Sequence, residues 1–224
     1  MKRLISLVLT FILVSLISTT AFANTDTMLI YKAEAGESVE EMLVNLKEAG
    51  YHSAYKAELS NDLGVKFEVD VYAVDTSALS RSGEKSISYL ASLSDAKLVA
   101  STRAGFWDEY WDKTGSVLFS MTITYSTNSS NYIQMTNVKG EYSIKQSGIQ
   151  VAKQSVVYRQ LSAYVGVEEY GAKYPTSSSF NYDTGFTEWV PNNEATQVFG
   201  ANWSGTINRG SDSWKFEFLN YKYL

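Results

Sequence analysis

The sequence predicts a mainly β protein: an antiparallel β-sandwich, immunoglobulin-like in general form, preceded by a small strand–helix–strand region. Between Val117 and Tyr125, apolar residues alternate with Ser and Thr, which is the period of a strand with one buried face. Further alternating segments, separated by turn residues, follow at short intervals toward the C-terminus. Aromatic residues make up 14% of the chain and Cys is absent, so we expect packing alone to hold the core.

The first residues have the pattern of a secretory signal peptide. Lys2 and Arg3 precede an apolar run, residues 4–17, that is too short to favour a permanent membrane span. The motif Ala21–Ala23 fits signal peptidase and would leave Asn24 as the mature start. We therefore expect a secreted, extracellular protein without a stable membrane anchor. The expected divisions are a signal peptide (1–23), a small α+β region (24–85) and a β-sandwich domain (86–224).

The N-terminal region contains one convincing helix, Gly36–Gly50. Ser38 followed by Glu41 has the spacing of a capping box, and Gly50 is a plausible stop. A stripe at helical spacing predicts that the helix docks on a sheet through Val39, Met42, Leu43 and Leu46. After the helix, Val65–Val71 alternates cleanly and predicts a strand with its charges outward.

A Ser- and Gly-rich stretch, residues 75–85, predicts a connection. The following segment, Ile87–Leu93, predicts a strand that turns at Ser94 and Asp95 into a second strand, Lys97–Arg103. A helix is the alternative in this part of the chain, because Leu90 breaks the alternation.

The strand predicted at Tyr132–Ile144 changes parity, because its apolar residues fall first on odd and later on even positions. A β-bulge near Thr136 and Asn137 would restore one apolar face. The next segment, Ile149–Val165, predicts another strand, and Gly166–Thr176 predicts a loop.

The C-terminal part predicts a short strand at Ser178–Tyr182 and an apolar segment at Gly185–Val190. A final hairpin is expected from Gly200–Ile207 and Trp214–Tyr221, with Gly210 free to adopt a positive φ in the turn.

Two stretches, Phe180–Phe186 and Gly210–Trp214, resemble uncharacterised secreted β-rich proteins of Gram-positive bacteria. The resemblance covers roughly Thr114–Tyr221. It implies the fold class and the extracellular compartment, and it carries no activity. Separately, Tyr31–Met42 resembles the opening of a LysM peptidoglycan-binding module, although the ending of that module is not recognisable in Leu63–Tyr72.

The charge balance argues against nucleic acid as a partner. The formal net charge is −5, and removal of Lys2 and Arg3 leaves 17 basic against 24 acidic residues, hence −7. No basic run is present, whereas nucleic acid or anionic lipid binding needs clustered Lys and Arg.

The densest group of aromatic and acidic residues precedes the Val117 strand. Exposed rings beside carboxylates suit sugar binding, since the ring face packs on the apolar face of a sugar and the carboxylate accepts hydroxyl hydrogen bonds. The tentative ligand-binding residues are Trp107, Asp108, Glu109, Tyr110, Trp111 and Asp112. Two alternatives are a turn whose rings cover the core and a Ca²⁺ site, although the spacing matches no EF-hand loop. We expect no metal and no cofactor.

Catalytic motifs are scarce. His52 is the only histidine, is expected in an exposed loop, and is accompanied by no Gly-x-Ser-x-Gly elbow. A carboxylate-dependent hydrolase would need two acidic groups about 5–10 Å apart across a cleft. The candidates for that pair are Glu109, Glu168, Glu169 and Glu188.

The leading interpretation is a secreted, non-catalytic interaction module that binds carbohydrate, cell wall or another extracellular protein. The hydrolase is one alternative. A membrane-active toxin or bacteriocin-like protein is the other, because the Ser- and Thr-rich hairpin Ser116–Gln134 alternates as a membrane-inserting hairpin does.

Overall fold

The computed structural model describes residues 30–62, 64–80, 83–100, 117–193 and 195–221. Its strands are β1 (Tyr31–Lys32), β2 (Tyr55–Ser60), β3 (Lys66–Asp75), β4 (Glu84–Ser92), β5 (Lys97–Ala100), β6 (Val117–Thr127), β7 (Tyr132–Ile144), β8 (Ile149–Ser162), β9 (Val167–Lys173), β10 (Ser179–Asp183), β11 (Val190–Pro191), β12 (Val198–Arg209) and β13 (Asp212–Tyr221). The helices are α2 (Val39–Glu48) and the short 3₁₀ turns η1 (Ser77–Leu79) and η2 (Leu93–Asp95).

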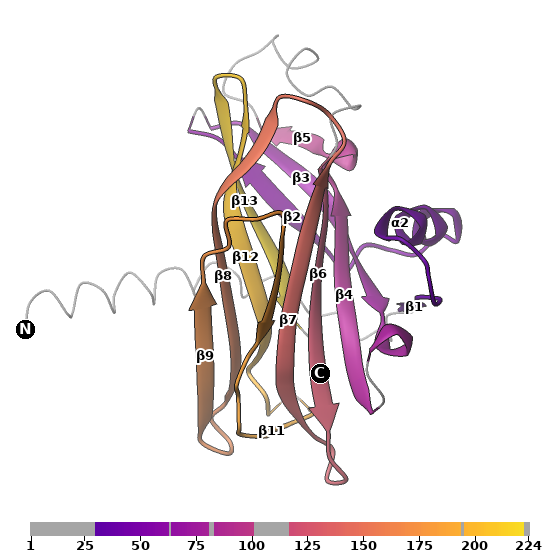
Figure 1. Ribbon diagram of the computed structural model, residues 1–224, viewed down its shortest axis with the longest axis vertical. Coiled ribbons are helices and arrows are strands. Elements are labelled where there is room, and N and C mark those ends of the chain that lie inside the picture. The colour runs from indigo at the N-terminus through magenta and orange to yellow at the C-terminus, as the bar shows by residue number, and fades with distance from the viewer. Residues whose placement is uncertain (1–29, 63, 81–82, 101–116, 194, 222–224) are drawn as a thin grey trace, which may run out of the picture.

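The strands form one sheet, in the order β10-β7-β6-β4-β3-β2-β13-β12-β8-β9, with β1 and β5 on β3 and β11 on β7. Figure 1 shows this sheet curling into a half-barrel, with α2 outside it on the side away from β9. The prediction of a mainly β, antiparallel fold is confirmed, and among the described strands only β1 pairs in parallel. The strands join into a single curled sheet rather than into two separately stacked sheets.

Residues of the predicted N-terminal region share this sheet with the rest of the chain. Strand β2 pairs with β13, and β3 pairs with β4. The sheet therefore runs through both parts of the sequence, and its ends are β10 and β9.

Aromatic side chains fill the concave side of the sheet. Trp203 is fully buried, and its ring lies 4.9 Å from that of Phe180 and 5.3 Å from that of Phe119, both edge-on. Phe216 packs on Phe119 at 5.0 Å. Gly140 makes room for this cluster, because a Cβ there would lie 2.3 Å from the Phe180 ring.

Helix α2 begins and ends as its sequence predicts. Ser38 and Glu41 form the capping box, with the Ser38 main-chain N–H donating to Oε2 of Glu41 at 2.8 Å. At the other end Gly50 adopts φ +74, and Tyr51 N–H donates to Leu46 C=O in a Schellman motif. The apolar stripe packs on the convex side of the sheet, where Met42, Leu43 and Leu46 meet Val74, Leu90 and Leu118.

The predicted bulge is confirmed in β7. Thr124 pairs with Asn137 and the next residue, Tyr125, pairs with Met135, which leaves Thr136 as the extra residue. The last hairpin is also confirmed, and its turn contains Gly210 at φ +60.

One predicted loop is wrong. Within Gly166–Thr176, the residues Val167–Lys173 form strand β9, which pairs with β8. Its sequence lacks an apolar face because it lies at the edge of the sheet, where only Val167 is buried. Strand β2 was also missed by sequence patterning.

Candidate functional site

The six residues expected to contact a ligand lie outside the described part of the chain. Binding through Trp107, Asp108, Glu109, Tyr110, Trp111 and Asp112 therefore stays a prediction. The most exposed aromatic side chains of the described residues lie instead around strand β9.

Three tyrosines project from the β8–β9 hairpin into solvent. Tyr164 lies in the turn, Tyr170 on the outer face of β9, and Tyr174 directly after β9. Their exposed fractions are 78%, 72% and 75%, the highest among the large hydrophobic side chains of the described residues. Exposed aromatic surface gathered on one hairpin is typical of an interaction site, because a tyrosine ring offers an apolar face and a polar tip.

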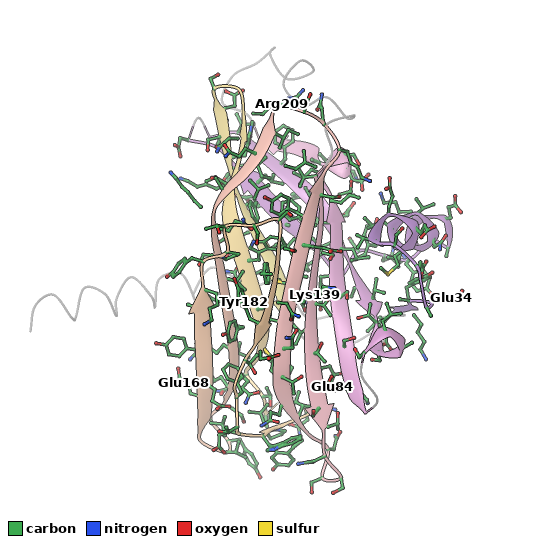
Figure 2. All side chains as sticks on the ribbon, in the orientation of Figure 1. Glu34, Glu84, Lys139, Glu168, Tyr182 and Arg209 are labelled. Atoms are coloured by element: carbon green, nitrogen blue, oxygen red, sulfur yellow. The ribbon has the colours of Figure 1, made fainter. Side chains whose placement is uncertain are left out.

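Strand β8 extends this surface. Arg159 lies opposite Tyr170 in the register, and Val157, itself 37% exposed, lies opposite Ala172. Nη2 of Arg159 donates to Oε1 of Glu168 at 2.5 Å, and its buried Nε has no hydrogen-bond partner among the described residues. Figure 2 labels Glu168 on β9. We use the term tyrosine surface for Val157, Arg159, Tyr164, Tyr170 and Tyr174.

A buried glutamine fixes β9 from the inner face. Gln160 is fully buried, and its amide nitrogen donates to Oε2 of Glu169 at 2.6 Å and to Glu188 C=O at 2.9 Å. Its oxygen accepts from Met135 N–H at 3.0 Å. Thr187 N–H donates to Oε1 of Glu169, also at 3.0 Å. One side chain thus ties together β7, β8, β9 and the segment that precedes β11.

Strands β9 and β10 are the two ends of the sheet and do not pair with each other. Side-chain contacts link this part of the sheet instead. Nζ of Lys173 lies 6.0 Å from the ring centroid of Tyr182, a residue labelled in Figure 2. The ring of Tyr158 lies 5.7 Å from that of Phe186 and covers Gly171, where a Cβ would lie 2.4 Å from it. Burial, and then the nearby Tyr182, raise the pKa of the Tyr158 hydroxyl. These contacts hold β9 as a rigid support for the tyrosines.

A groove lies on the outer face where β13 and β2 part. Their ladder covers only the pairs Lys215↔Ser60 and Phe216↔Leu59. The groove has a volume of about 770 Å³ and is lined by β2, β12, β13 and one residue of β8. Its charged lining residues are three lysines and two glutamates, Lys56, Lys153, Lys215, Glu58 and Glu217.

The acidic residues considered for hydrolysis are spread over different surroundings. Glu168 and Glu169 are neighbours in β9 and point to opposite faces, the first to Arg159 and the second to Gln160. Glu188 is exposed and meets Glu169 through its main-chain N–H, at 3.2 Å. Glu109 lies outside the described residues.

The two glutamates of the groove are each already bonded. Glu58 pairs with Lys66 at 2.9 Å, and Oε1 of Glu217 accepts from the amide of Asn202. Within the described residues, no group of three or more His, Asp or Glu side chains is placed to hold a metal ion. His52 is exposed after α2, as predicted.

The hairpin that alternates like a membrane-inserting segment is built into the core. Phe119, Met121 and Ile123 of β6 are buried against the concave cluster. Among the described residues, no helix combines the length and apolarity needed to cross a membrane.

The sequence signal for the tyrosine surface was present but weak. This stretch alternates between one set of residues, Glu168, Tyr170 and Ala172, and another, Val167 and Glu169. Its small apolar content nevertheless favours a loop. Comparison with known proteins adds no relative from which a role could be transferred: no family model, no curated protein and no solved structure matches the chain.

Proposed function

We propose that the mature chain is a secreted extracellular binding module without catalytic activity, and that it holds a cell-wall glycan on the tyrosine surface. The observation that supports this most directly is the exposure of Tyr164, Tyr170 and Tyr174, each about three-quarters in solvent on one hairpin. Folding alone gives no reason to keep three aromatic rings in water along one hairpin.

Tyrosine suits a sugar ligand for a physical reason. The flat ring packs on the apolar C–H face of a pyranose, while the phenolic hydroxyl exchanges hydrogen bonds with sugar hydroxyls. Arg159 lies opposite Tyr170 and supplies further N–H donors at the centre of the surface. Exposed rings spaced along a strand fit an extended polymer better than a small enclosed molecule.

Contacts that position β9 before a ligand binds also support this proposal. Glu169 is held from inside by Gln160, and the Tyr158 ring packs tightly over Gly171. The strand that carries Tyr170 is therefore fixed before a ligand arrives, which lowers the entropy lost on binding.

The test is a pull-down of the mature chain on purified Gram-positive cell-wall polysaccharide, together with a glycan array. Wild type should bind at least one glycan. The variant with Tyr170→Ala and Tyr174→Ala should lose about tenfold in affinity, equivalent to about 1.4 kcal/mol. The matched control is Leu79→Ala, which removes an exposed apolar side chain far from the hairpin, at η1.

Unchanged glycan affinity in the tyrosine variant would exclude the tyrosine surface as the site. Capture of a protein, together with binding to no glycan, would mean that the ligand is a protein rather than a glycan. N-terminal sequencing of the exported protein tests the compartment, because cleavage after Ala23 leaves Asn24 as the first residue.

A further inference from the structure

The groove between β2 and β13 is lined by residues other than those of the tyrosine surface. Its volume of about 770 Å³ lies in the range of small-molecule sites. The β2–β13 ladder stops at Leu59, and beyond it the Tyr55 hydroxyl reaches across to Leu219. Ser60 and Ser204 are among the lining residues of the groove.

Lys153 reaches this groove from an unusual backbone position. The β8–β12 register shifts between Ser204 and Thr206, so that Lys153 and Gln154 together oppose Gly205. Lys153 adopts φ +51, in the left-handed region that favours Gly or Asn. A long charged side chain is therefore kept where glycine would fit with less strain, and such outliers concentrate at functional sites.

The residue opposite the bulge is constrained as well. A Cβ on Gly205 would lie 2.8 Å from the Phe216 ring and 3.0 Å from Ala152 C=O. Thr206 donates from its hydroxyl to the same carbonyl at 3.2 Å. The bulge is thus fixed on both strands, and it holds the backbone of Lys153 in place at the groove.

The other charged side chains that line the groove already have ion-pair or hydrogen-bond partners. Lys56 pairs with Glu68 and Lys215 with Asp62, each at 2.9 Å. The glutamates have the partners given above, Lys66 for Glu58 and the Asn202 amide for Glu217. Among the described residues, Lys153 forms no ion pair within 4.0 Å, so its ammonium is the cation left for a ligand.

We propose that the groove binds a sugar acid, with the ammonium of Lys153 pairing with the carboxylate and the hydroxyls of Ser60 and Ser204 bonding to the sugar hydroxyls. A carboxylate fits better than a phosphate. Glu58 and Glu217 line the same groove, and they repel a doubly charged anion more strongly than a singly charged one. This site is independent of glycan binding by the tyrosines.

The probe is galacturonate, which carries a single carboxylate, titrated into the mature chain by calorimetry at low ionic strength, with neutral galactose and inorganic phosphate as comparison ligands. Lys153→Gly should lower the affinity for galacturonate by about tenfold or more, because a charge-assisted hydrogen bond is lost. Its thermal midpoint should equal or exceed that of wild type, because glycine tolerates the left-handed backbone. Lys153→Arg should retain binding.

Two further variants separate this site from the rest of the surface. Lys139→Ala removes an exposed lysine of β7, labelled in Figure 2, and should leave the affinity unchanged. The tyrosine variant of the preceding section should also bind galacturonate normally.

Equal affinity in wild type and Lys153→Gly would overturn the assignment of Lys153, and absence of binding to wild type would overturn the site itself. Phosphate binding as tight as that of galacturonate would overturn the choice of a carboxylate. Loss of galacturonate binding in the tyrosine variant would show that the two surfaces are one site.

Discussion

The Tyr55 hydroxyl forms the two main-chain hydrogen bonds with Leu219 that a neighbouring strand would otherwise form. It accepts a hydrogen bond from Leu219 N–H at 2.8 Å and donates one to Leu219 C=O. Strands β2 and β13 have already parted at this point, because their ladder ends at the pair Phe216↔Leu59. One side chain thus satisfies both main-chain groups and leaves the groove open beside it.

Replacement of Tyr55 by Phe should destabilise the protein by about 1–3 kcal/mol, because Leu219 N–H and C=O lose their partner in a half-buried position. Urea unfolding of wild type and variant measures this difference. Tyr164→Phe is the matched control, since that hydroxyl is exposed, and it should change stability by less than about 0.5 kcal/mol. Equal effects of the two substitutions would contradict a bridging role for Tyr55.

Substitution of Gly171 by Ala should destabilise β9 by about 1–3 kcal/mol, because the new methyl group would lie 2.4 Å from the Tyr158 ring. The same substitution in a Tyr158→Ala background should cost much less, since the obstructing ring is gone. Thermal unfolding of the four proteins gives the coupling directly. An additive result would mean that the Tyr158 ring is not the source of the cost.

Gln160→Leu should cost about 2 kcal/mol or more, because Met135 N–H and Glu188 C=O are both left without their partner. Hydrogen exchange should quicken at the Met135 amide. Gln150→Leu, at an exposed position of the same strand, is the control and should be nearly neutral. Unchanged exchange at Met135 would show that another group replaces the glutamine.

The capping box should make stability depend on acid. The Ser38 main-chain N–H, and then its hydroxyl, lower the pKa of the Glu41 carboxyl. A carboxyl with a lowered folded pKa contributes stability above its unfolded pKa, about 4.3, and loses that contribution as the pH falls through the folded value.

Chemical unfolding of wild type between about pH 5 and pH 2 should therefore show stability declining with acid in this window. The decline should be smaller in Ser38→Ala, which removes the hydroxyl and lowers stability at neutral pH by about 1 kcal/mol. Identical pH slopes in the two proteins would rule out the capping box as a contributor.

Local pattern was enough to predict several features of this fold. The parity change in Tyr132–Ile144 placed a bulge near Thr136 and Asn137, because a strand must keep one apolar face on the core, and the extra residue is Thr136. Ser38, Glu41 and Gly50 marked the ends of α2, because caps depend on residues only a few positions apart.

The candidate surfaces were decided by distant parts of the chain. Strand β9 has little apolar pattern and is held by Gln160 and by the cover of Tyr158 over Gly171. The groove depends on β2 and β13, whose paired residues Leu59 and Phe216 lie more than 150 positions apart. Sequence patterns that span a few residues do not predict contacts between such distant positions.

The sequence by itself determined most of the strands, although not β2 and β9, as well as the helix and its caps, because these follow from the period of apolar residues and from short-range hydrogen bonds. Only the tertiary structure decided that the strands curl into one sheet, that Tyr164, Tyr170 and Tyr174 stay in water, and that Lys153 lines a groove. The exposure of a side chain and the pairing of a strand depend on which segments meet across the sheet. The sequence around one residue does not specify those segments.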